Sequence, residues 1–109
     1  MSARLPTHLI VGALLRRVND AGGIAVVRAR GDADTGAILV LLERENRLLE
    51  RAIDLDGHDM LIPSGPAATS ADSPDEYWMK RRARDPDLWV VALDIPDGER
   101  FAAETILGN

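Results

Sequence analysis

The sequence predicts one α+β domain over residues 1–109. We expect an N-terminal helix, a mostly antiparallel sheet of four to six strands and a second helix before the C-terminal strands. Three observations carry this prediction. Helix-like and strand-like segments are segregated along the chain, the links between strand-like segments are short, and 46% of the residues are hydrophobic, enough for one core. A doubly wound parallel fold would instead alternate strands with helices.

The first helix is expected to begin after Pro6, with the Thr7 hydroxyl as the N-cap that accepts a hydrogen bond from an unpaired amide. Apolar side chains then recur at the spacing of one helix face, at Val11, Leu14, Leu15 and Val18. Gly22 and Gly23 follow this stripe. Because glycine commonly ends helices, we expect the helix to stop there.

Four strand-like segments follow, at residues 24–30, 36–43, 47–55 and 58–62. The second is almost wholly apolar, which predicts a central strand covered on both faces. In the third, polar and apolar residues alternate so that one strand face is partly exposed to solvent. Asp56 and Gly57 are a strong turn signal between the last two strands, and Pro63 is expected to close the fourth.

The second helix is expected after a small, polar stretch at residues 64–73, which we interpret as a mobile loop. Ser73, Pro74 and Glu76 have the pattern of a capping box with proline at the first helical position. The helix that they begin is expected to run to about Arg84, just before an Asp-Pro pair.

The chain is expected to end in strands. Residues 88–95 (LWVVALDI) are apolar throughout most of their length and predict a strand. A Pro-Asp-Gly turn follows at residues 96–98. Residues 99–105 fit a returning strand or a short helix, and we predict the strand.

Composition narrows the classes of function. The formal net charge of −5 and the presence of only four aromatic residues argue against a general nucleic-acid binder, which needs basic surface and stacking platforms. The chain has no cysteine, which fits a reducing cytoplasm. The apolar run at residues 9–15 is far shorter than a bilayer requires. We therefore expect a cytoplasmic protein with no membrane segment and no cofactor.

The segment Arg-Gly-Asp-Ala-Asp-Thr-Gly at residues 30–36 is the densest cluster of turn-forming and charged residues. Its glycines supply backbone conformations that other residues avoid, and Asp32 and Asp34 can bond to their own backbone. We therefore predict a tight hairpin connection between the first two strands.

The same carboxylates allow a second interpretation, a metal-dependent phosphoester hydrolase or nuclease-like enzyme. In it, Asp34 and Glu43 share a metal ion, with Asp32 and His58 as further candidate ligands. The known motifs of this kind are incomplete here, because Glu45 stands where a nuclease lysine is expected.

The second helix carries the candidate interface, which consists of Tyr77, Trp78, Arg81 and Arg82. Aromatic residues beside arginines are typical anchors of protein interfaces. The apolar strand at residues 37–42 also has little charge to guard a sheet edge. We therefore expect a protein-interaction or ligand-binding module, with an unknown protein partner or a second copy of the chain, rather than an enzyme.

Several segments together resemble a small bacterial family of unknown function, DUF1491. They are Leu-Pro-Thr at 5–7, Val-Gly-Ala-Leu-Leu-Arg-Arg at 11–17, Ala-Gly-Gly at 21–23, Arg-Gly-Asp-Ala-Asp-Thr-Gly-Ala at 30–37 and Asp-Pro-Asp-Leu-Trp-Val-Val at 85–91. The resemblance implies a compact bacterial protein of about this length. It implies no activity, cofactor or catalytic residue.

Overall fold

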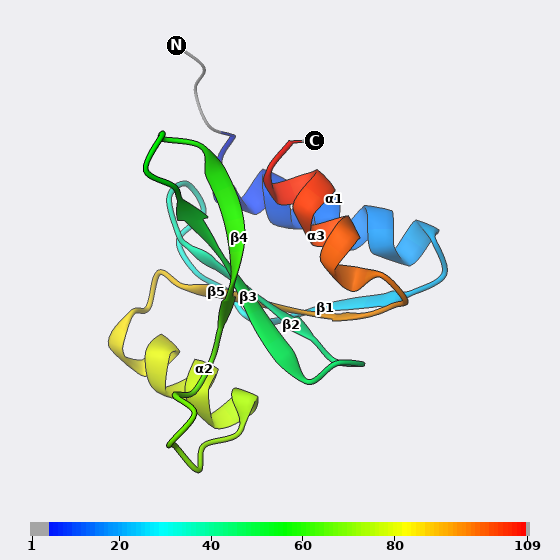
Figure 1. Ribbon diagram of the computed structural model, residues 1–109. Helices are drawn as coiled ribbons and strands as arrows, with labels where there is room; N and C mark the ends of the chain where they lie inside the picture. The colour runs from blue at the N-terminus through cyan, green and yellow to red at the C-terminus, as the bar shows by residue number, and fades with distance from the viewer. Residues whose placement is uncertain (1–4, 109) are drawn as a thin grey trace.

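The computed structural model describes residues 5–108 as a five-stranded sheet with helices on both faces (Figure 1). Along the chain, the elements are α1 (Thr7–Asp20), β1 (Ile24–Ala29), β2 (Ile38–Leu42), β3 (Arg47–Ile53), β4 (Asp59–Ser64), α2 (Pro74–Arg84), β5 (Trp89–Asp94) and α3 (Gly98–Ile106). The expected α+β class is confirmed. Residues 1–4 and 109 of the expected domain lie outside the described residues. No helix within residues 5–108 is long and apolar enough to cross a membrane.

Strand β2 lies at the centre of the sheet, whose order is β1-β5-β2-β3-β4. It pairs antiparallel with β3 and parallel with β5, and the remaining pairs are antiparallel. All of its side chains are buried, as the sequence predicts for a central strand. The idea that residues 37–42 form a poorly guarded edge is wrong, because the edge strands of the described sheet are β1 and β4.

The connection at residues 30–37 is not a hairpin, contrary to the prediction. Strand β5 lies between β1 and β2 and pairs with both of them. The connection therefore passes the start of β5, where the Trp89 amide donates to the Ala37 carbonyl at 2.8 Å. Because β5 comes from the C-terminal part of the chain, the local pattern of residues 24–43 could not reveal it.

The sheet separates two apolar cores. Helices α1 and α3 cover one face, and α2 lies on the opposite face (Figure 1). Successive residues of a strand point to opposite faces, so β2 and β5 supply both cores. The core beneath α2 consists of Leu39, Leu41, Leu48, Leu88, Val90 and Ala92.

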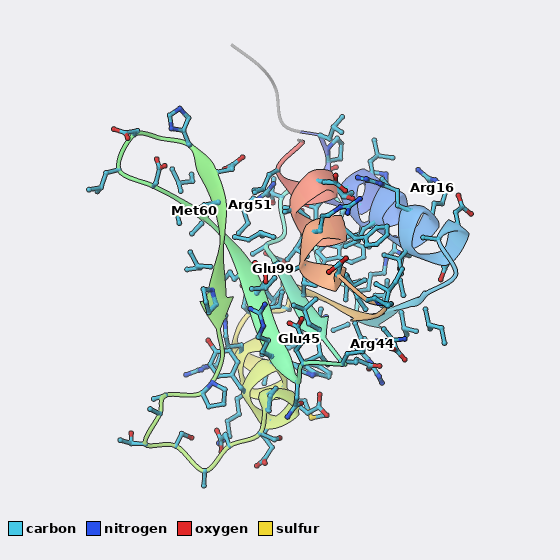
Figure 2. All side chains as sticks on the ribbon, turned by 45° about the vertical axis from the view of Figure 1, so that its right-hand side comes forward. Arg16, Arg44, Glu45, Arg51, Met60 and Glu99 are labelled. Atoms are coloured by element: carbon cyan, nitrogen blue, oxygen red, sulfur yellow. The ribbon has the colours of Figure 1, made fainter. Side chains whose placement is uncertain are left out.

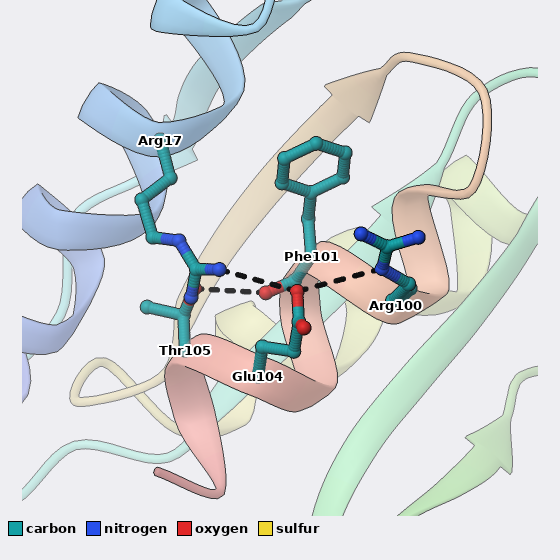
Figure 3. A network of polar contacts seen from close by, with 5 residues as sticks. All are labelled: Arg17, Arg100, Phe101, Glu104 and Thr105. Atoms are coloured by element: carbon teal, nitrogen blue, oxygen red, sulfur yellow. Dashed lines mark hydrogen bonds and ion pairs between the residues drawn. The ribbon is translucent and has the colours of Figure 1, made fainter. Parts of the chain in front are cut away.

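Helices α1 and α3 are joined by a polar network (Figure 3). Arg17 donates to the Thr105 hydroxyl at 2.9 Å and to the Glu104 carboxylate at 3.1 Å. Arg100 lies 3.6 Å from the same carboxylate oxygen, and Thr105 in turn donates to the Phe101 carbonyl at 2.8 Å. The ion-paired side chains are partly exposed, so each pair contributes at most about 1 kcal/mol.

Helix α3 replaces the strand that was predicted at residues 99–105, so that prediction is wrong. Its buried residues are Gly98, Ala102 and Ile106, which recur every four positions along the chain. That repeat places them on one helix face, whereas a strand would need a repeat of two. Two alanines in this segment also favour a helix over a strand.

Strand β4 continues through Pro63, where the sequence suggested that it ends. Pro63 lies opposite Leu49 in the antiparallel pair with β3. Proline lacks the amide that a central strand needs, but β4 is an edge strand with only one neighbour. The fold therefore tolerates it there.

The two turns of the β2-β3-β4 meander lie at opposite ends of the sheet (Figure 2). Arg44 and Glu45 belong to the turn between β2 and β3. Met60 lies near the other turn, where Gly57 adopts a positive φ of 84° as the Asp-Gly signal predicts.

Candidate functional site

The Asp32 carboxylate holds the connection between β1 and β2 in its turn. Its Oδ2 atom accepts hydrogen bonds from the Thr35 amide at 2.8 Å, the Thr35 hydroxyl at 3.0 Å and the Asp34 amide at 3.1 Å. These bonds, the Thr35 amide first among them, lower the pKa of Asp32 because they favour the charged form. Asp32 therefore acts on its own backbone, as expected for a turn residue.

Backbone carbonyls of the same connection cap helix α1. The Thr7 amide donates to the Asp34 carbonyl at 3.1 Å, and the His8 amide donates to the Ala33 carbonyl at 2.9 Å. The Thr7 hydroxyl donates to the Gly36 carbonyl at 2.9 Å. The prediction of Thr7 as N-cap is wrong, because Thr7 is the first helical residue and its hydroxyl donates to another segment.

The connection also lies against the start of β5 with almost no space between the backbones. A Cβ atom added at Gly31 or Gly36 would lie 2.1 Å from the Asp87 carbonyl oxygen. The Asp32 amide donates to that carbonyl at 3.0 Å, and the Trp89 indole donates to the Asp32 carbonyl at 2.6 Å. This segment therefore joins α1, β2 and β5.

The structure does not bring Asp34 and Glu43 together. Asp34 precedes β2 and Glu43 directly follows it, and a strand of five residues is about 17 Å long. Glu43 instead accepts a hydrogen bond from Arg28 at 2.5 Å. The two carboxylates cannot coordinate one metal ion in this arrangement.

His58 lies in the turn between β3 and β4, with Asp54 and Asp56. The potential ligand atoms of these three exposed side chains lie within 4.8 Å of one another. One Asp54 oxygen already accepts from the backbone amides of Asp56 and His58, both at 2.9 Å. The cluster is thus explained by the turn that it stabilises, and neither Asp34 nor Glu43 belongs to it.

The four candidate interface residues all point toward the sheet of their own chain. Tyr77, Trp78, Arg81 and Arg82 are half-buried, and their spacing of i, i+1, i+4 and i+5 places them on one side of α2. Tyr77 and Trp78 pack against the core beneath α2. We call these four residues the inner face of α2. In this conformation most of their surface lies against their own chain, and the prediction that they bind a partner stays a prediction.

One edge of the inner face is fastened to β3 and β4. Arg81 forms a bidentate pair with Glu50, with distances of 2.6 and 3.1 Å. Ser64 donates to Glu50 at 3.1 Å and lies 3.1 Å from the Tyr77 hydroxyl. The bond to Ser64 lowers the pKa of Tyr77, and the bond to Glu50 raises the pKa of Arg81.

The other edge of the inner face reaches the end of β1. Arg82 donates to the Arg30 carbonyl at 2.8 Å, and its Nε atom is buried without a hydrogen-bond partner among the described residues. The Arg30 guanidinium lies 5.4 Å from the centre of the Trp89 ring. The indole of Trp78 donates back to Asp75 of its own helix at 2.9 Å.

Glu50 and Ser64, the partners of the inner face, are not among the residues predicted from the sequence. Glu50 alternates with Leu48 and Ala52 along β3, so it belongs to the strand face that carries the buried Leu48. A carboxylate among apolar side chains of one strand face is the signal that could have predicted a buried cationic partner. The identity of that partner, Arg81, depends on tertiary structure.

Strand β1 presents an apolar patch to solvent, formed by Ile24 and Val26. Their side chains are 60% and 44% exposed. The Ala25 side chain points to the opposite face of the sheet, where it packs with Val27 against the core beneath α1 and α3. Ile24 and Val26 therefore lie on the sheet face that α2 covers elsewhere. We call these two residues the β1 patch.

The comparisons with known proteins identify the family. The family model described as a protein of unknown function (DUF1491) matches residues 5–103. The chain belongs to the DUF1491 family. The resemblance noted in the sequence is thereby confirmed. No curated protein matches the chain.

Three solved structures share the fold, and two of them are described as DUF1491 family proteins. The crystal structure of a DUF1491 family protein from Caulobacter crescentus CB15 is 34% identical, with a TM-score of 0.73, over 90% of this chain and 94% of that one. The NMR structure of a DUF1491 family protein from the same organism gives 34% identity and a TM-score of 0.71, over 92% and 94%. Protein Atu0922 from A. tumefaciens is 26% identical, with a TM-score of 0.61, over 96% and 93%.

Proposed function

We propose that this DUF1491 protein is an interaction module of the bacterial cytoplasm that pairs with a second copy through strand β1. The observation that carries the proposal is the exposed β1 patch. Val26 lies beside Ala92 of β5, which in turn lies beside Leu41 of β2. The buried apolar row of the sheet thus continues onto the exposed edge strand. A second β1 strand, paired antiparallel at this edge, would place its own Val26 beside this one and shield part of both side chains from solvent.

Charge distribution favours a second copy as the partner. Arg28 lies toward one end of β1, while Ile24 at the other end lies beside Asp94 of β5. A two-fold axis at Val26 places Arg28 of one copy opposite Ile24 of the other, within reach of Asp94. The Arg28 side chain already spans β5 to reach Glu43 of β2 in its own chain. Opposite charges therefore come close at both ends of the contact, where Asp94 also accepts from Arg44 of its own chain at 2.8 Å.

The contact is expected to be weak. A standard interface takes about 20–30 residues from each partner, whereas the β1 patch has two apolar residues and their neighbours. Asn19 already accepts the Ala25 amide at 3.2 Å, and a bulge interrupts the register between Val27 and Ala29. Both features limit backbone pairing at this edge. We expect a dissociation constant of about 0.1 mM or weaker.

Sedimentation equilibrium over a range of protein concentrations tests the proposal. We expect the natural chain to dimerise and Val26→Lys to stay monomeric at the same concentrations. Ile53→Lys is the control, because Ile53 is also an exposed apolar strand residue, at 61% against 44% for Val26, but lies in the hairpin at the other edge of the sheet. A natural chain that is monomeric at every concentration, or a dimer that Val26→Lys leaves unchanged, contradicts the proposal.

A further inference from the structure

Helix α2 covers an apolar face without contributing a fully buried residue. The six core residues beneath it are at most 5% exposed. Helix α1 has five buried residues and α3 has three, whereas α2 has none. Since apolar burial is the main term that holds an element in place, α2 is the helix least firmly held to the sheet.

Apart from the packing of the half-buried Tyr77 and Trp78, the contacts that fasten α2 are polar and lie at its edges. Arg81 and Glu50, the strongest pair, keep 24% and 23% of their side-chain surface exposed. Arg82 reaches the Arg30 carbonyl from the other edge. Water can replace such partners when the helix moves away, so these bonds set the position of α2 more than they resist its departure.

The contacts that stabilise α2 as a helix lie within the helix and the residues directly before it. Ser73 and Glu76 form a reciprocal capping box, with bonds of 3.1 and 3.2 Å. Lys80 pairs with Asp72 at 2.9 Å, and Trp78 bonds to Asp75. All of these bonds lie within residues 72–84, so none is lost when α2 leaves the sheet.

The two links of α2 differ in length. Residues 65–73 join it to β4, and they include Gly65 with a positive φ of 141° and no atom near its missing side chain. Residues 85–88 form a much shorter link to β5, and Leu88 at its end is buried. The short link can act as a pivot while the long link gives the helix room to swing.

We propose that α2 is a displaceable cover, which opens from the sheet as a helical unit while the sheet, α1 and α3 stay folded. Opening exposes the apolar face around Leu39 and, at the same time, the inner face of α2. The inference stands on the packing of α2 alone and does not depend on pairing through β1.

Thiol labelling of two single-cysteine variants tests this opening, because the chain has no cysteine of its own. Leu39 and Val40 are adjacent in β2 and both 0% exposed, but Leu39 lies beneath α2 and Val40 beneath α1 and α3. Each labelling rate is compared with the rate that global unfolding of that variant predicts. We expect Leu39→Cys to be labelled at least about tenfold faster than this limit, and Val40→Cys at the limit.

Weakening the fastening should speed the opening. In the Leu39→Cys background, Arg81→Gln is expected to raise the labelling rate several-fold. Arg17→Gln, which removes the link between α1 and α3, is the matched control and should not raise the ratio of labelling to global unfolding. The proposal is overturned if both cysteine variants are labelled only at the rate that global unfolding predicts. It is also overturned if Arg17→Gln raises the labelling of Leu39→Cys, relative to global unfolding, as much as Arg81→Gln does.

Hydrogen exchange of the natural chain gives a test that needs no variant. We expect the amides of α2 that bond within the helix to exchange through openings of lower free energy than the amides of β2 and β5. Because the opened helix frays on its own, its amides exchange while those of the sheet stay protected. Identical opening free energies for α2 and β2 overturn the proposal.

Discussion

At the scale of single residues, glycine is required at positions 31 and 36 because another backbone segment lies too close for a side chain, and not because of the backbone conformation. Neither has a positive φ, but both face the Asp87 carbonyl at a distance that leaves no room for a methyl group. The contact is with backbone, which cannot turn away as a side chain could. These two glycines let the connection between β1 and β2 pass close to β5.

We therefore expect Gly36→Ala to lower the free energy of unfolding by about 2–3 kcal/mol, because the added carbon displaces the backbone of residue 87. Gly12→Ala is the control, since Gly12 lies in α1 with only the end of Arg16 nearby, at 3.5 Å. That change should raise stability by about 0.5–1 kcal/mol. Urea denaturation measures both, and equal effects would refute the packing argument.

Asp32 gives a prediction of pH dependence. Its pKa is lower in the folded chain than the ordinary 3.8, because the turn donates hydrogen bonds to the charged form. A lowered folded-state pKa stabilises the fold above the ordinary value, and that stabilisation disappears as the pH falls through the lowered value. The natural chain should therefore exceed Asp32→Ala in stability at neutral pH and lose this advantage in acid. Asp34→Ala, which removes none of the three bonds, should show a smaller difference.

The separation of Asp34 from Glu43 predicts that no shared metal ion stabilises the chain. A metal bound at 100 times its dissociation constant would add about 2.7 kcal/mol to the free energy of unfolding. Thermal denaturation with magnesium, manganese, calcium and zinc measures this effect. We expect the natural chain and Asp34→Ala to respond alike, and a stabilisation lost only in Asp34→Ala would restore the enzyme hypothesis.

At the scale of elements, the three helices are held in different ways. Helices α1 and α3 have apolar stripes that the sheet buries, whereas α2 has no fully buried residue and depends on its caps, on polar contacts and on two half-buried aromatic side chains. The sequence already shows the caps of α2, because capping is a local pattern. It does not show that α3 is a helix, because residues 99–105 are few and their apolar positions are ambiguous until Ala102 and Ile106 are seen on one face.

The capping box of α2 is expected to contribute measurably to the free energy of unfolding. Ser73→Ala removes the acceptor for the Glu76 amide and should cost about 1 kcal/mol. Glu76→Gln keeps an oxygen that can accept from the Ser73 amide, so we expect a smaller loss. The comparison is made by thermal denaturation, and a loss from Glu76→Gln as large as that from Ser73→Ala would argue against the reciprocal cap.

At the scale of the whole molecule, strand order is the feature that the sequence could not supply. Each of the five strands has a local signature in the sequence, such as the apolar run of β2 or the Asp-Gly turn after β3. The insertion of β5 between β1 and β2 depends on contacts between distant segments, for example Val27 with Val91. The contacts of the candidate residues could not be predicted for the same reason, because the partners of Arg81 and Glu43 lie on other elements.

Insertion of β5 has a consequence for how the protein is made. A ribosome releases β1, β2 and the β3-β4 hairpin before β5 exists, so β1 emerges with no neighbour to pair with. The sheet can close only when residues 89–94 have been synthesised, followed directly by α3, which completes the core over α1. Nascent chains that stop before Leu88 should therefore remain sensitive to protease, and the apolar strand β2 should be a site for chaperones during that interval.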